Sequence, residues 1–454
     1  MIILCNIADW NKNNISLLAK TIYPNAKIIN TSSFRKFDEL DIISDFYKKM
    51  ANKAEFKARD ENENKEIIIR CRMLRLLKKD ESSKIVSAMR DSIYEKLKSN
   101  QVDLIITEIV DQYFHDILVR EAKKLNIKVI APIQTFVNGY SRLTMYGENN
   151  IFRIPEDREI IEISKKLDNQ NYQPNYITKL KISNLSQHIK RVFKNFLRYV
   201  YFNLKLLFPR NKYDYHYLAS SKGILRYASI FQISSFVENS NWKNNLLKSS
   251  KPILYIPLQW YPESTVDYWC KNINVIDFEK VFVQMVIKLS FNFTIAIKEH
   301  PASLGLRNPS FIKKVNSLLS DDIFCIPSNI PSNYVVQKTN AVLVWTGSVG
   351  FEAAYRGKPV FTMGDPYYAS GRFFCKVNLE TSLSKFVNFI IDCENKPMKD
   401  TEKKELVKNL LSGFIKGFFR NDASYDKANK NHVKEIVDLA KNIKKYYIID
   451  DEVV

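Results

Sequence analysis

The chain has 454 residues, a formal net charge of +20, and a composition that is 45% hydrophobic and 13% aromatic. This composition predicts globular folding, and the length is more than one hydrophobic core usually supports, which suggests two domains. The six cysteines are scattered without paired spacing, which argues against a zinc site or a disulfide framework and favours a reducing compartment. The positive charge leaves nucleic acid, anionic membranes and anionic substrates as candidate partners.

The N-terminus and the hydropathy of the chain give no sign of secretion or membrane insertion. Residues 1–11 lack a basic start followed by a long apolar region, so they are typical of a first strand and not of a signal peptide. No uninterrupted apolar run reaches about 18 residues, the length that a membrane-spanning helix requires. We therefore expect a cytoplasmic protein.

The first half of the chain alternates strands and helices. Short apolar runs predict strands over residues 1–7, 26–30, 103–107 and 128–131. Residues 37–98 and 111–125 are typical of helices, and residues 132–148 are expected to form a loop. Strands that alternate with helices predict βαβ units and a parallel sheet.

A strongly basic segment follows this half. From Lys179 to Lys212 the chain contains nine Lys and Arg residues and no Asp or Glu, and the basic residues alternate with large apolar ones. This pattern, over about residues 177–212, resembles a basic amphipathic helix that lies on an anionic membrane surface. The alternative is a helix that packs on the protein core and keeps a solvated basic face.

A second α/β series begins near residue 251. Apolar runs predict strands over residues 253–258, 294–298, 323–327, 341–345 and 359–363, with helices between them. Residues 402–449 are expected to be helical. The predicted fold class is α/β, with two Rossmann-like doubly wound domains facing a cleft, a GT-B-like architecture with added helices. The competing arrangement is one large sheet with insertions.

Residues 340–366 carry the clearest signal for a binding site. A strand is followed by the small residues 346–350, a helix-like segment and a second strand. A strand–helix–strand unit this short must be parallel, so its turn lies at the carboxyl edge of a sheet, where open α/β folds bind ligands. The turn also leads into a helix N-terminus, which favours a phosphate. An ordinary tight turn capped by Thr346 or Ser348 would show the same pattern.

Two further segments follow predicted strands and would reach the same edge. Together with the turn, they supply Gln259, Glu263, Lys298, His300, Pro301, Thr346, Gly347 and Ser348. This set suits a phosphate leaving group, because His300 could hydrogen-bond or protonate it and Ser348 could hold its oxygens. A single histidine after a strand is more often structural, but three such segments in succession favour a functional interpretation.

Three segments resemble a known family: KEHP (298–301), TGSVGFEAAYRGKPVFTMGDPYY (346–368) and IPLQWYPEST (256–265). They are similar to the capsule polysaccharide biosynthesis proteins, glycosyltransferases of GT-B type that include bacterial β-Kdo transferases. The resemblance spans about residues 253–368, and in the first half it is confined to residues 103–132. The first two segments are also similar to those of bacterial polysialyltransferases and teichoic-acid glycerophosphotransferases. These families use cytidine-nucleotide donors, so the resemblance implies a CMP-activated acidic sugar such as CMP-Kdo.

The resemblance also implies roles for individual residues. His300, Thr346 and Ser348 would bind the donor phosphate, and Glu352 could meet the ribose or cytidine or merely stabilise its helix. Gly347 and Ser348 stand where relatives often carry paired hydroxyls. On this interpretation, an acceptor-side domain is expected at residues 1–240, a donor domain at 241–400, and additional helices at 401–454.

An inverting displacement needs a base for the acceptor hydroxyl, placed across the cleft. Glu108, Asp111 and His115 follow a predicted strand. Glu108 is preferred because it comes first, whereas Asp111 could cap the next helix. Asp9, after the first strand, is a further candidate. No DxD motif stands at a convincing strand end, so we predict no metal and no cofactor, and the cationic donor site would offset the leaving-group charge.

The resemblance implies a glycosyltransferase that builds a capsule or other surface glycan on a glycan or glycolipid acceptor. With the basic segment, it predicts a peripheral location at the inner face of the cell membrane. A CDP-polyol phosphotransferase of teichoic-acid type is the enzymatic alternative, and the shared motifs do not separate the two. A basic nucleic-acid-binding protein is the alternative from another class. It has the net charge in its favour but no recognised binding signature, so we expect no nucleic acid partner.

Overall fold

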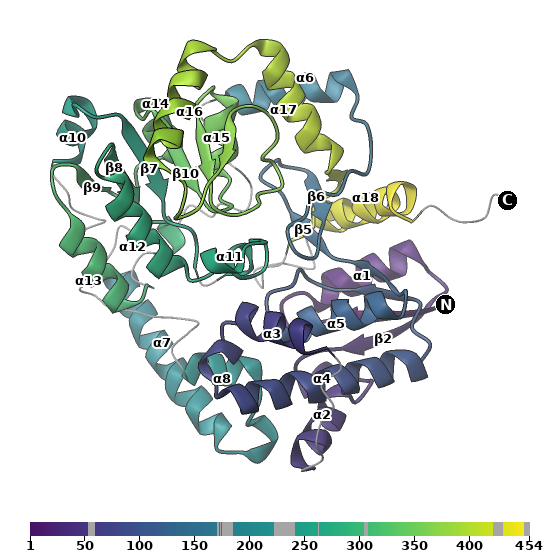
Figure 1. The fold of residues 1–454 in the computed structure, drawn as a ribbon. Coiled ribbons are helices and arrows are strands. Elements are labelled where there is room, and N and C mark those ends of the chain that lie inside the picture. Colours follow the sequence, from purple (N-terminus) through teal and green to yellow (C-terminus); the bar gives the residue numbers. More distant parts are fainter. Residues whose placement is uncertain are drawn as a thin grey trace.

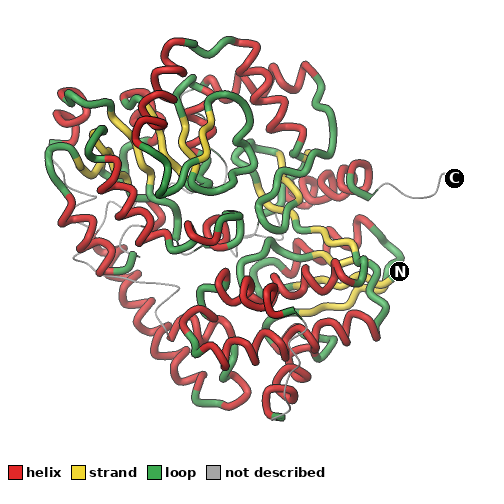
Figure 2. Tube along the Cα trace, in the orientation of Figure 1, coloured by secondary structure: helices red, strands yellow, loops and turns green. Residues whose placement is uncertain are grey.

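The computed structural model describes residues 1–52, 60–169, 172, 174, 185–221, 241–261, 263–303, 307–420 and 430–448. The chain forms two α/β halves, one above the other in Figure 1, and each half is built on a parallel sheet flanked by helices. Figure 2 shows the strands of both halves enclosed by helices. A small antiparallel sheet lies near the boundary between the halves.

The first half contains a four-stranded parallel sheet in the order β2-β1-β3-β4. Its strands are β1 (Ile2–Asn6), β2 (Lys27–Thr31), β3 (Leu104–Ile106) and β4 (Lys128–Ile130). Its helices are α1 (Lys12–Ile22), α2 (Ile42–Ala51), α3 (Glu61–Arg70), α4 (Lys79–Ser99) and α5 (Tyr113–Lys124). Because β1 lies between β2 and β3, the connections diverge at the carboxyl ends of β1 and β3, a position where open α/β sheets bind ligands.

The second half contains a six-stranded parallel sheet in the order β12-β11-β10-β7-β8-β9. Its strands are β7 (Ile253–Pro257), β8 (Thr294–Lys298), β9 (Ile323–Ile326), β10 (Ala341–Val344), β11 (Val360–Thr362) and β12 (Phe374–Lys376). Its helices are α11 (Ser264–Asp267), α12 (Phe278–Leu289), α13 (Pro309–Leu318), α14 (Ser332–Lys338), α15 (Val349–Tyr355) and α16 (Leu383–Asn395). This is the strand order of the Rossmann fold, and its switch point lies between β7 and β10.

The burial of the central strands explains their sequences. Every residue of β8, β9 and β10 is buried. Helices cover both faces of a parallel sheet, so its strands consist of continuous apolar runs and not of alternating apolar and polar residues. The strands predicted from such runs are confirmed in both halves.

The antiparallel sheet corrects one prediction. Strand β5 (Pro132–Gln134) pairs with β6 (Tyr140–Leu143), and β6 pairs with β13 (Ile415–Lys416). The expectation of a loop over residues 132–148 is therefore wrong, because this segment contains a hairpin. Strands of two to four residues, one of which pairs with a segment far along the chain, are too short to show a hydrophobic period.

The C-terminal segment also differs from the prediction of continuous helix over residues 402–449. Helix α17 (Asp400–Ser412) ends before β13, and α18 (Lys430–Tyr446) begins after it. Helix α18 packs against α1 of the first half, and Figure 1 shows it beside that half. Its apolar residues join the core around α1, namely Ile436, Leu439, Ala440 and Ile443. The end of the chain thus helps to complete the first core.

The two halves are joined by a helical connection that includes α6 (Asp157–Asp168), α7 (Leu185–Leu206), α8 (Tyr215–Ser221) and α10 (Trp242–Lys248). The predicted basic helix is confirmed over α7, whereas residues 177–184 lie outside the described residues. Helix α7 leaves large apolar side chains exposed. In the part of the chain that the structure describes, α7 and every other helix are too short or too polar to cross a membrane.

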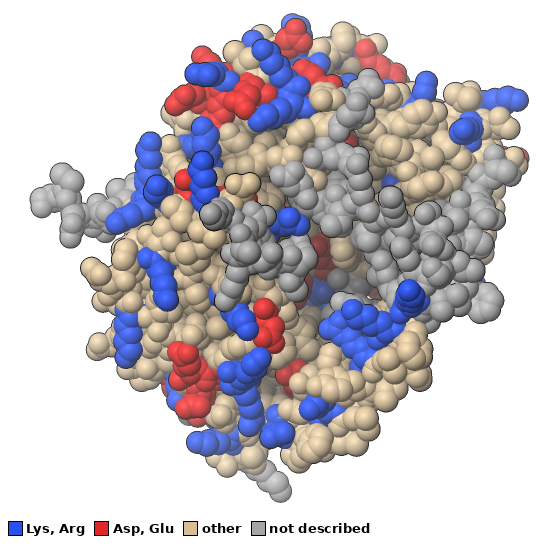
Figure 3. Space-filling view, turned by 180° about the vertical axis from the view of Figure 1, so that it is seen from behind, with Lys and Arg blue, Asp and Glu red and all other residues tan. Residues whose placement is uncertain are grey.

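One buried arginine shows how the halves face each other. Arg72, between α3 and the short 3-10 helix η2 (Leu74–Leu76), contacts both Asp111, which follows β3, and Asp267, which follows β7. The carboxyl edges of the two sheets therefore point towards each other. Seen from behind, the surface is hollowed between the halves (Figure 3). The predicted α/β fold class, with two doubly wound halves and added helices, is confirmed.

Candidate active site

The loop after β7 and the turn after β10 lie side by side at the switch point of the second sheet. Gln259 Nε2 donates a hydrogen bond to Thr265 Oγ1 (3.0 Å), and Thr265 Oγ1 donates to the Glu263 carboxylate (2.8 Å). A Cβ atom placed on Gly347 would lie 3.3 Å from Gln259 Oε1. The structure thus brings together two of the three segments that the sequence singled out.

The turn after β10 uses its two hydroxyl groups differently. Thr346 is buried, and its hydroxyl donates to the Thr265 carbonyl (2.9 Å), so it helps to hold the turn against the β7 loop. Ser348 is the N-cap residue of α15, but its side chain makes no capping hydrogen bond, and its hydroxyl makes no other hydrogen bond to the described residues. Ser348 is therefore free to bind a ligand, and simple helix capping does not account for it.

The turn is also held from outside by Tyr368. The Tyr368 hydroxyl donates to the Gly347 carbonyl. A Cβ atom on Gly350 would lie 2.5 Å from the Tyr368 hydroxyl oxygen and 2.9 Å from Val344. Gly350 is therefore required for packing, while the space beside Gly347 is restricted only by Gln259. No pattern in the sequence indicates that Tyr368, in the Tyr-Tyr pair after β11, supports the turn.

Lys298, the last residue of β8, is the cation of the site. Its side chain is buried, yet no carboxylate of the described residues lies within ion-pair distance of the ammonium group. Burial lowers the pKa of Lys298 to about 8, and the nearby charges of Glu299 and Glu352 oppose that change. A buried ammonium without an ion pair is costly, so this group favours an anionic ligand.

His300 follows Lys298 on the same loop, with Pro301 opening the short 3-10 helix η6 (Pro301–Ser303). The His300 residue is exposed, and its ring lies 5.2 Å from that of Trp260, centroid to centroid. Loss of hydration against the surrounding protein, together with the charges of Lys298 and Arg307, lowers the pKa of His300 to about 4. The imidazole is thus neutral at pH 7, and a bound anion would raise its proton affinity.

A buried ion pair supports this loop, and sequence reasoning missed it. Arg307 Nε donates to Glu299 Oε2 (2.8 Å) and Arg307 Nη2 to Glu299 Oε1 (2.9 Å), with both side chains 1% exposed. Arg307 Nη2 also donates to the Gln259 carbonyl. The pair therefore ties the end of β8 to the loop after β7. Only the position of Glu299 between Lys298 and His300 could have suggested it.

Glu352 lies one turn into α15 and is half-buried. Burial raises the pKa of its carboxyl, and the charges of Arg356 and Lys298 lower it. The charge of Glu352 raises the pKa of Lys298, and the charge of Lys298 lowers the pKa of Glu352, so the two groups lie near each other. This position suits either a contact to donor hydroxyls or a local charge balance with Lys298.

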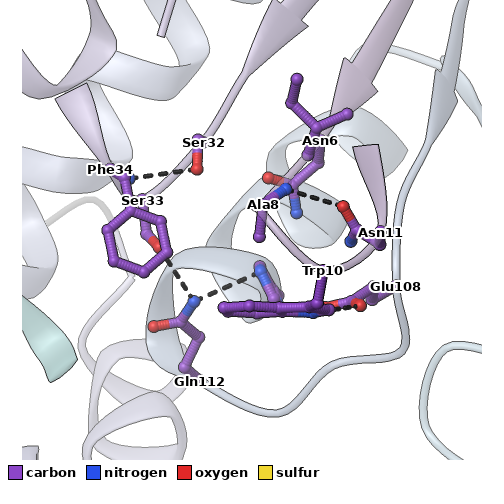
Figure 4. A pocket seen from close by; sticks show the side chains of 11 residues that line it. Asn6, Ala8, Trp10, Asn11, Ser32, Ser33, Phe34, Glu108 and Gln112 are labelled. Carbon is purple, nitrogen blue, oxygen red and sulfur yellow. Dashed lines mark hydrogen bonds between the residues drawn. The ribbon is translucent and has the colours of Figure 1, made fainter. Parts of the chain in front are cut away.

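Glu108 lines a separate small pocket at the carboxyl edge of the first sheet (Figure 4). Trp10 Nε1 donates to Glu108 Oε1 (2.7 Å), and the figure shows Glu108 on one side of the pocket and Phe34 on the other. Burial raises the pKa of Glu108 to about 7, although hydrogen bonds from Trp10 and Asn11 lower it. His115 lines the same pocket, and burial lowers its pKa to about 4.

Asp111 and Glu263 meet at the boundary of the two halves. The Asp111 carboxylate pairs with Arg72 (2.5 Å), and Arg72 pairs in turn with the buried Asp267 (3.0 Å). Burial raises the pKa of Glu263 to about 7, and the negative charge of Asp111 acts in the same direction. Asp111 is thus held by an arginine, whereas Glu108 is not held by any cation among the described residues. Asp9, the other predicted candidate, pairs with Lys12 and Lys36.

Within the described ranges of the chain, no group of three or more His, Cys, Asp or Glu side chains could hold a metal ion. The expectation of a reaction without metal stays a prediction.

Comparisons with known proteins agree with the sequence patterns. The family model for capsule polysaccharide biosynthesis protein matches residues 163–371. No curated protein sequence matches the chain.

Among solved structures, the Thermosulfurimonas dismutans KpsC β-Kdo 2,7-transferase is 12% identical, with a TM-score of 0.36, over 91% of this chain and 89% of that chain. The β-Kdo 2,4-transferase of the same protein is 10% identical, with a TM-score of 0.33, over 68% and 79%. A UDP-GlcNAc 2-epimerase from Neisseria meningitidis is 12% identical, with a TM-score of 0.27, over 99% and 100%. These similarities are distant, and the fold assignment rests on the strand orders described above.

The family match covers β7 to β11 and includes the segments of Lys298, His300 and Ser348. The resemblance predicted from these segments is confirmed: residues 163–371 match the capsule polysaccharide biosynthesis family.

Proposed function

We propose that this protein is a glycosyltransferase that transfers an acidic, Kdo-like sugar from a CMP-activated donor to a glycan or glycolipid acceptor of a capsule or surface polysaccharide. The observation that carries the proposal is a buried cation and a hydroxyl group at the carboxyl edge of the second sheet. Among the described residues, the buried ammonium of Lys298 has no ion pair and the Ser348 hydroxyl makes no hydrogen bond. Charge and hydrogen-bond donors of this kind suit the phosphate of a nucleotide.

In the proposed reaction, an acceptor hydroxyl attacks the anomeric carbon of the donor. The bond from that carbon to the phosphate oxygen breaks, its electron pair stays on the oxygen, and CMP leaves. Lys298 and the Ser348 hydroxyl stabilise the charge that develops on the phosphate. His300, neutral in the free protein, donates an N–H hydrogen bond to the departing oxygen. Helix α15 has only seven residues, so we assign the main electrostatic contribution to Lys298 and not to the helix.

Glu108 is the base that the geometry favours for the acceptor hydroxyl. Its pKa of about 7 allows it to be ionised in the free enzyme and to accept a proton. The pocket beside it has a volume of about 10 Å³, which is roughly the space of a single water molecule. The acceptor therefore presents one hydroxyl to this pocket, and its other groups lie outside. Asp111, held by Arg72, is the weaker candidate.

Helix α7 supports a peripheral location at an anionic membrane surface. Phe193, Phe196 and Leu204 are more than half exposed, at 61%, 59% and 56%. The same helix carries Lys190, Lys194, Arg198 and Lys205 and no acidic residue. Apolar side chains inserted between lipid headgroups, together with basic side chains near them, are typical of interfacial helices.

The proposal is tested by calorimetric titration of the purified protein with CMP, CDP, UDP and GDP. We expect CMP to bind more tightly than UDP or GDP. The Ser348→Ala variant should bind CMP about ten- to a hundredfold more weakly, because a hydrogen bond to a charged group contributes roughly 1.5–3 kcal/mol. Ser317→Ala, an exposed position on α13, is the matched control and should bind CMP normally. Equal CMP affinity in both variants would refute the assignment of the donor site.

Turnover with labelled donors then separates CMP-Kdo-like sugars from CDP-glycerol or CDP-ribitol. Transfer of a polyol phosphate instead of a sugar would refute the proposed activity. It would show that the protein is a CDP-polyol phosphotransferase. A CMP-sugar that is transferred with inverted anomeric configuration would support the single-displacement mechanism.

A further inference from the structure

Helix α11 connects the turn after β10, which carries Ser348, to the first half of the chain. It is four residues long, and isolated helices shorter than about 12 residues are marginal in water. Its position therefore depends on its surroundings and not on its own backbone hydrogen bonds. Figure 1 shows α11 at the boundary between the halves, beside α3. Ser264 and Asp267 are buried, so the contacts that fix the helix come from protein groups.

At Thr265, α11 supports the turn after β10. The Thr346 hydroxyl donates to the Thr265 carbonyl (2.9 Å), and Gln259 Nε2 donates to the Thr265 hydroxyl (3.0 Å). Thr346 lies two residues before Ser348, the proposed phosphate ligand. A shift of α11 would break the bond to Thr346 or carry the turn along with it. The position of α11 therefore influences where the Ser348 hydroxyl lies.

The end of α11 is held by Arg70, the last residue of α3. Its guanidinium donates to the carbonyls of Asp267 (3.0 Å), Cys270 (2.9 Å) and Lys271 (3.3 Å). The last carbonyls of a helix have no partner within the helix, and a cation at that end is favourable. Bonds to three backbone carbonyls also fix the main chain of residues 267–271, which a pair of side chains would not do. Arg70 is 6% exposed, so water competes little for these bonds.

Two more arginines of the first half hold the side chain of Asp267. Arg72 Nε lies 3.0 Å from Asp267 Oδ2, and Arg75 Nη2 donates to Asp267 Oδ1 (3.1 Å). Both carboxylate oxygens are thus used, and the Asp267 side chain is 0% exposed. Arg70, Arg72 and Arg75, which we call the arginine clamp, therefore hold the C-terminal end of α11 by its main chain and by its side chain.

The second support of the turn is also held from the first half. Arg142, on β6, is 3% exposed, and its guanidinium lies 3.6 Å from the centroid of the Tyr367 ring. Tyr367 precedes Tyr368, whose hydroxyl donates to the Gly347 carbonyl. The same guanidinium lies 5.3 Å from the ring of Trp269, which follows α11. Both supports of the turn, α11 and the tyrosine pair, therefore contact buried arginines of the first half.

We infer that the arginine clamp positions the donor site, although its three residues belong to the opposite half of the chain. The clamp acts through α11, which holds Thr346, and not by contact with the donor. The inference rests on the proposed function, because it gives the first half a part in shaping the turn that binds the donor phosphate. Since Arg72 also pairs with Asp111, one guanidinium joins the carboxyl edge of the first sheet to the support of the donor turn.

The test compares two buried arginines in the full-length protein, by CMP titration below the melting temperature of each variant. Arg70→Lys keeps the charge but lacks the planar fork that reaches several carbonyls at once. It should bind CMP about tenfold more weakly, because binding groups must be held within about 0.5 Å of their working positions. Arg90→Lys is the matched control, since Arg90 is 2% exposed and bonds to Glu121 and Asn64 within the first half. Both variants should melt earlier, but Arg90→Lys should bind CMP normally.

A double variant tests the route through α11. Thr346→Val keeps the shape of the side chain and removes the bond to the Thr265 carbonyl, so it should weaken CMP binding by a similar factor. If the clamp acts through this bond, Arg70→Lys/Thr346→Val should bind CMP about as weakly as either single variant. A loss of about a hundredfold, as expected for two independent effects, would overturn the route. If Arg70→Lys does not fold, Arg75→Lys gives the same comparisons from the most exposed member of the clamp, at 24%.

CMP titration of the unaltered protein separates this inference from the proposed function. Equal CMP affinity of the unaltered protein and the clamp variant would overturn the inference alone. An equal loss of affinity in Arg70→Lys and Arg90→Lys would also overturn it, because the loss would then follow from reduced stability. If the unaltered protein does not bind CMP, the donor assignment is overturned, and this inference with it.

Discussion

Lys298 is a residue whose proposed function opposes the stability of the fold. In the unfolded chain its pKa is 10.5, whereas in the fold burial lowers it to about 8. Between these values the unfolded state binds more protons, so stability should rise as the pH increases from 8 to 10.5. A pKa difference of this size corresponds to about 3 kcal/mol, which is the cost of the buried charge below pH 8.

We therefore expect Lys298→Met to raise the melting temperature of the unliganded protein at pH 7 and to weaken CMP binding by about tenfold or more. Melting temperature and CMP affinity are measured on the same sample. Lys288→Met, at a lysine that donates to the Leu379 carbonyl, is the control and should leave CMP affinity unchanged. A Lys298→Met protein that melts earlier and binds CMP normally would show that the lysine is structural.

Glu108 should determine the pH dependence of turnover. Its pKa is about 7, and a base must be ionised, so kcat/KM should rise with pH through about 7 and then level off. Glu108→Gln keeps an oxygen that can accept from Trp10, and it should lower turnover about a hundredfold or more, the usual scale for an acid–base group. Asp111→Asn is the comparison. If that variant loses more activity than Glu108→Gln and abolishes the rise with pH, Asp111 is the base instead.

At the level of elements, the turn between β10 and α15 is tightly packed at Gly350 and accessible at Gly347. A methyl group on Gly350 would meet Tyr368 and Val344 at less than 3 Å, whereas on Gly347 it would meet only Gln259 Oε1 at 3.3 Å. Gly350→Ala should therefore destabilise the protein by about 1–3 kcal/mol, the usual cost of overpacking. Gly347→Ala should change the melting temperature less. Thermal unfolding of both variants checks the order, and the reverse order would contradict the packing of Tyr368.

Helix α7 is the element on which the membrane proposal depends. Each Lys or Arg near an anionic surface contributes about 1 kcal/mol, weakened by salt. Lys190→Gln/Lys194→Gln should reduce co-sedimentation with anionic vesicles about thirtyfold, because two such contributions add to about 2 kcal/mol. Lys441→Gln/Lys445→Gln removes the same charge from α18, which Figure 1 places on the other side of the molecule. Equal loss in both variants would indicate attraction by net charge and not by α7.

At the level of the whole molecule, the buried Asp267 holds the two halves together. It pairs with Arg72 (3.0 Å) and Arg75 (3.1 Å) of the first half and is itself 0% exposed. Asp267→Ala leaves Arg75 without its carboxylate and the buried Arg72 with Asp111 alone. Breaking a buried pair in this way costs about 3–5 kcal/mol.

We expect Asp267→Ala to lower the melting temperature strongly, and Asp392→Ala, an exposed position on α16, to leave it nearly unchanged. Calorimetric unfolding of the two variants provides the measurement. If both variants unfold at the same temperature as the unaltered protein, the contacts of Asp267 do not stabilise the association of the halves.

The α/β class, the central strands of both sheets and the three segments of the proposed donor site could be predicted from the sequence. They could be predicted because these features are local. A continuous apolar run shows a strand buried on both faces, and a polar residue directly after such a run must lie at the carboxyl edge of a parallel sheet. Lys298, His300 and Ser348 were therefore found without knowledge of their neighbours. The basic amphipathic pattern of α7 is local in the same sense.

The packing of the fold was needed to show which of these residues are held by neighbours. The Thr346 hydroxyl is used within the protein and Asp111 is held by Arg72, whereas Ser348 and Lys298 have no side-chain hydrogen bond or ion pair among the described residues. The packing also pairs β13 with β6 and places α18 against α1. Contacts between residues more than a hundred positions apart leave no periodic trace in a single sequence, because they depend on how the elements pack and not on the spacing of residues within one element.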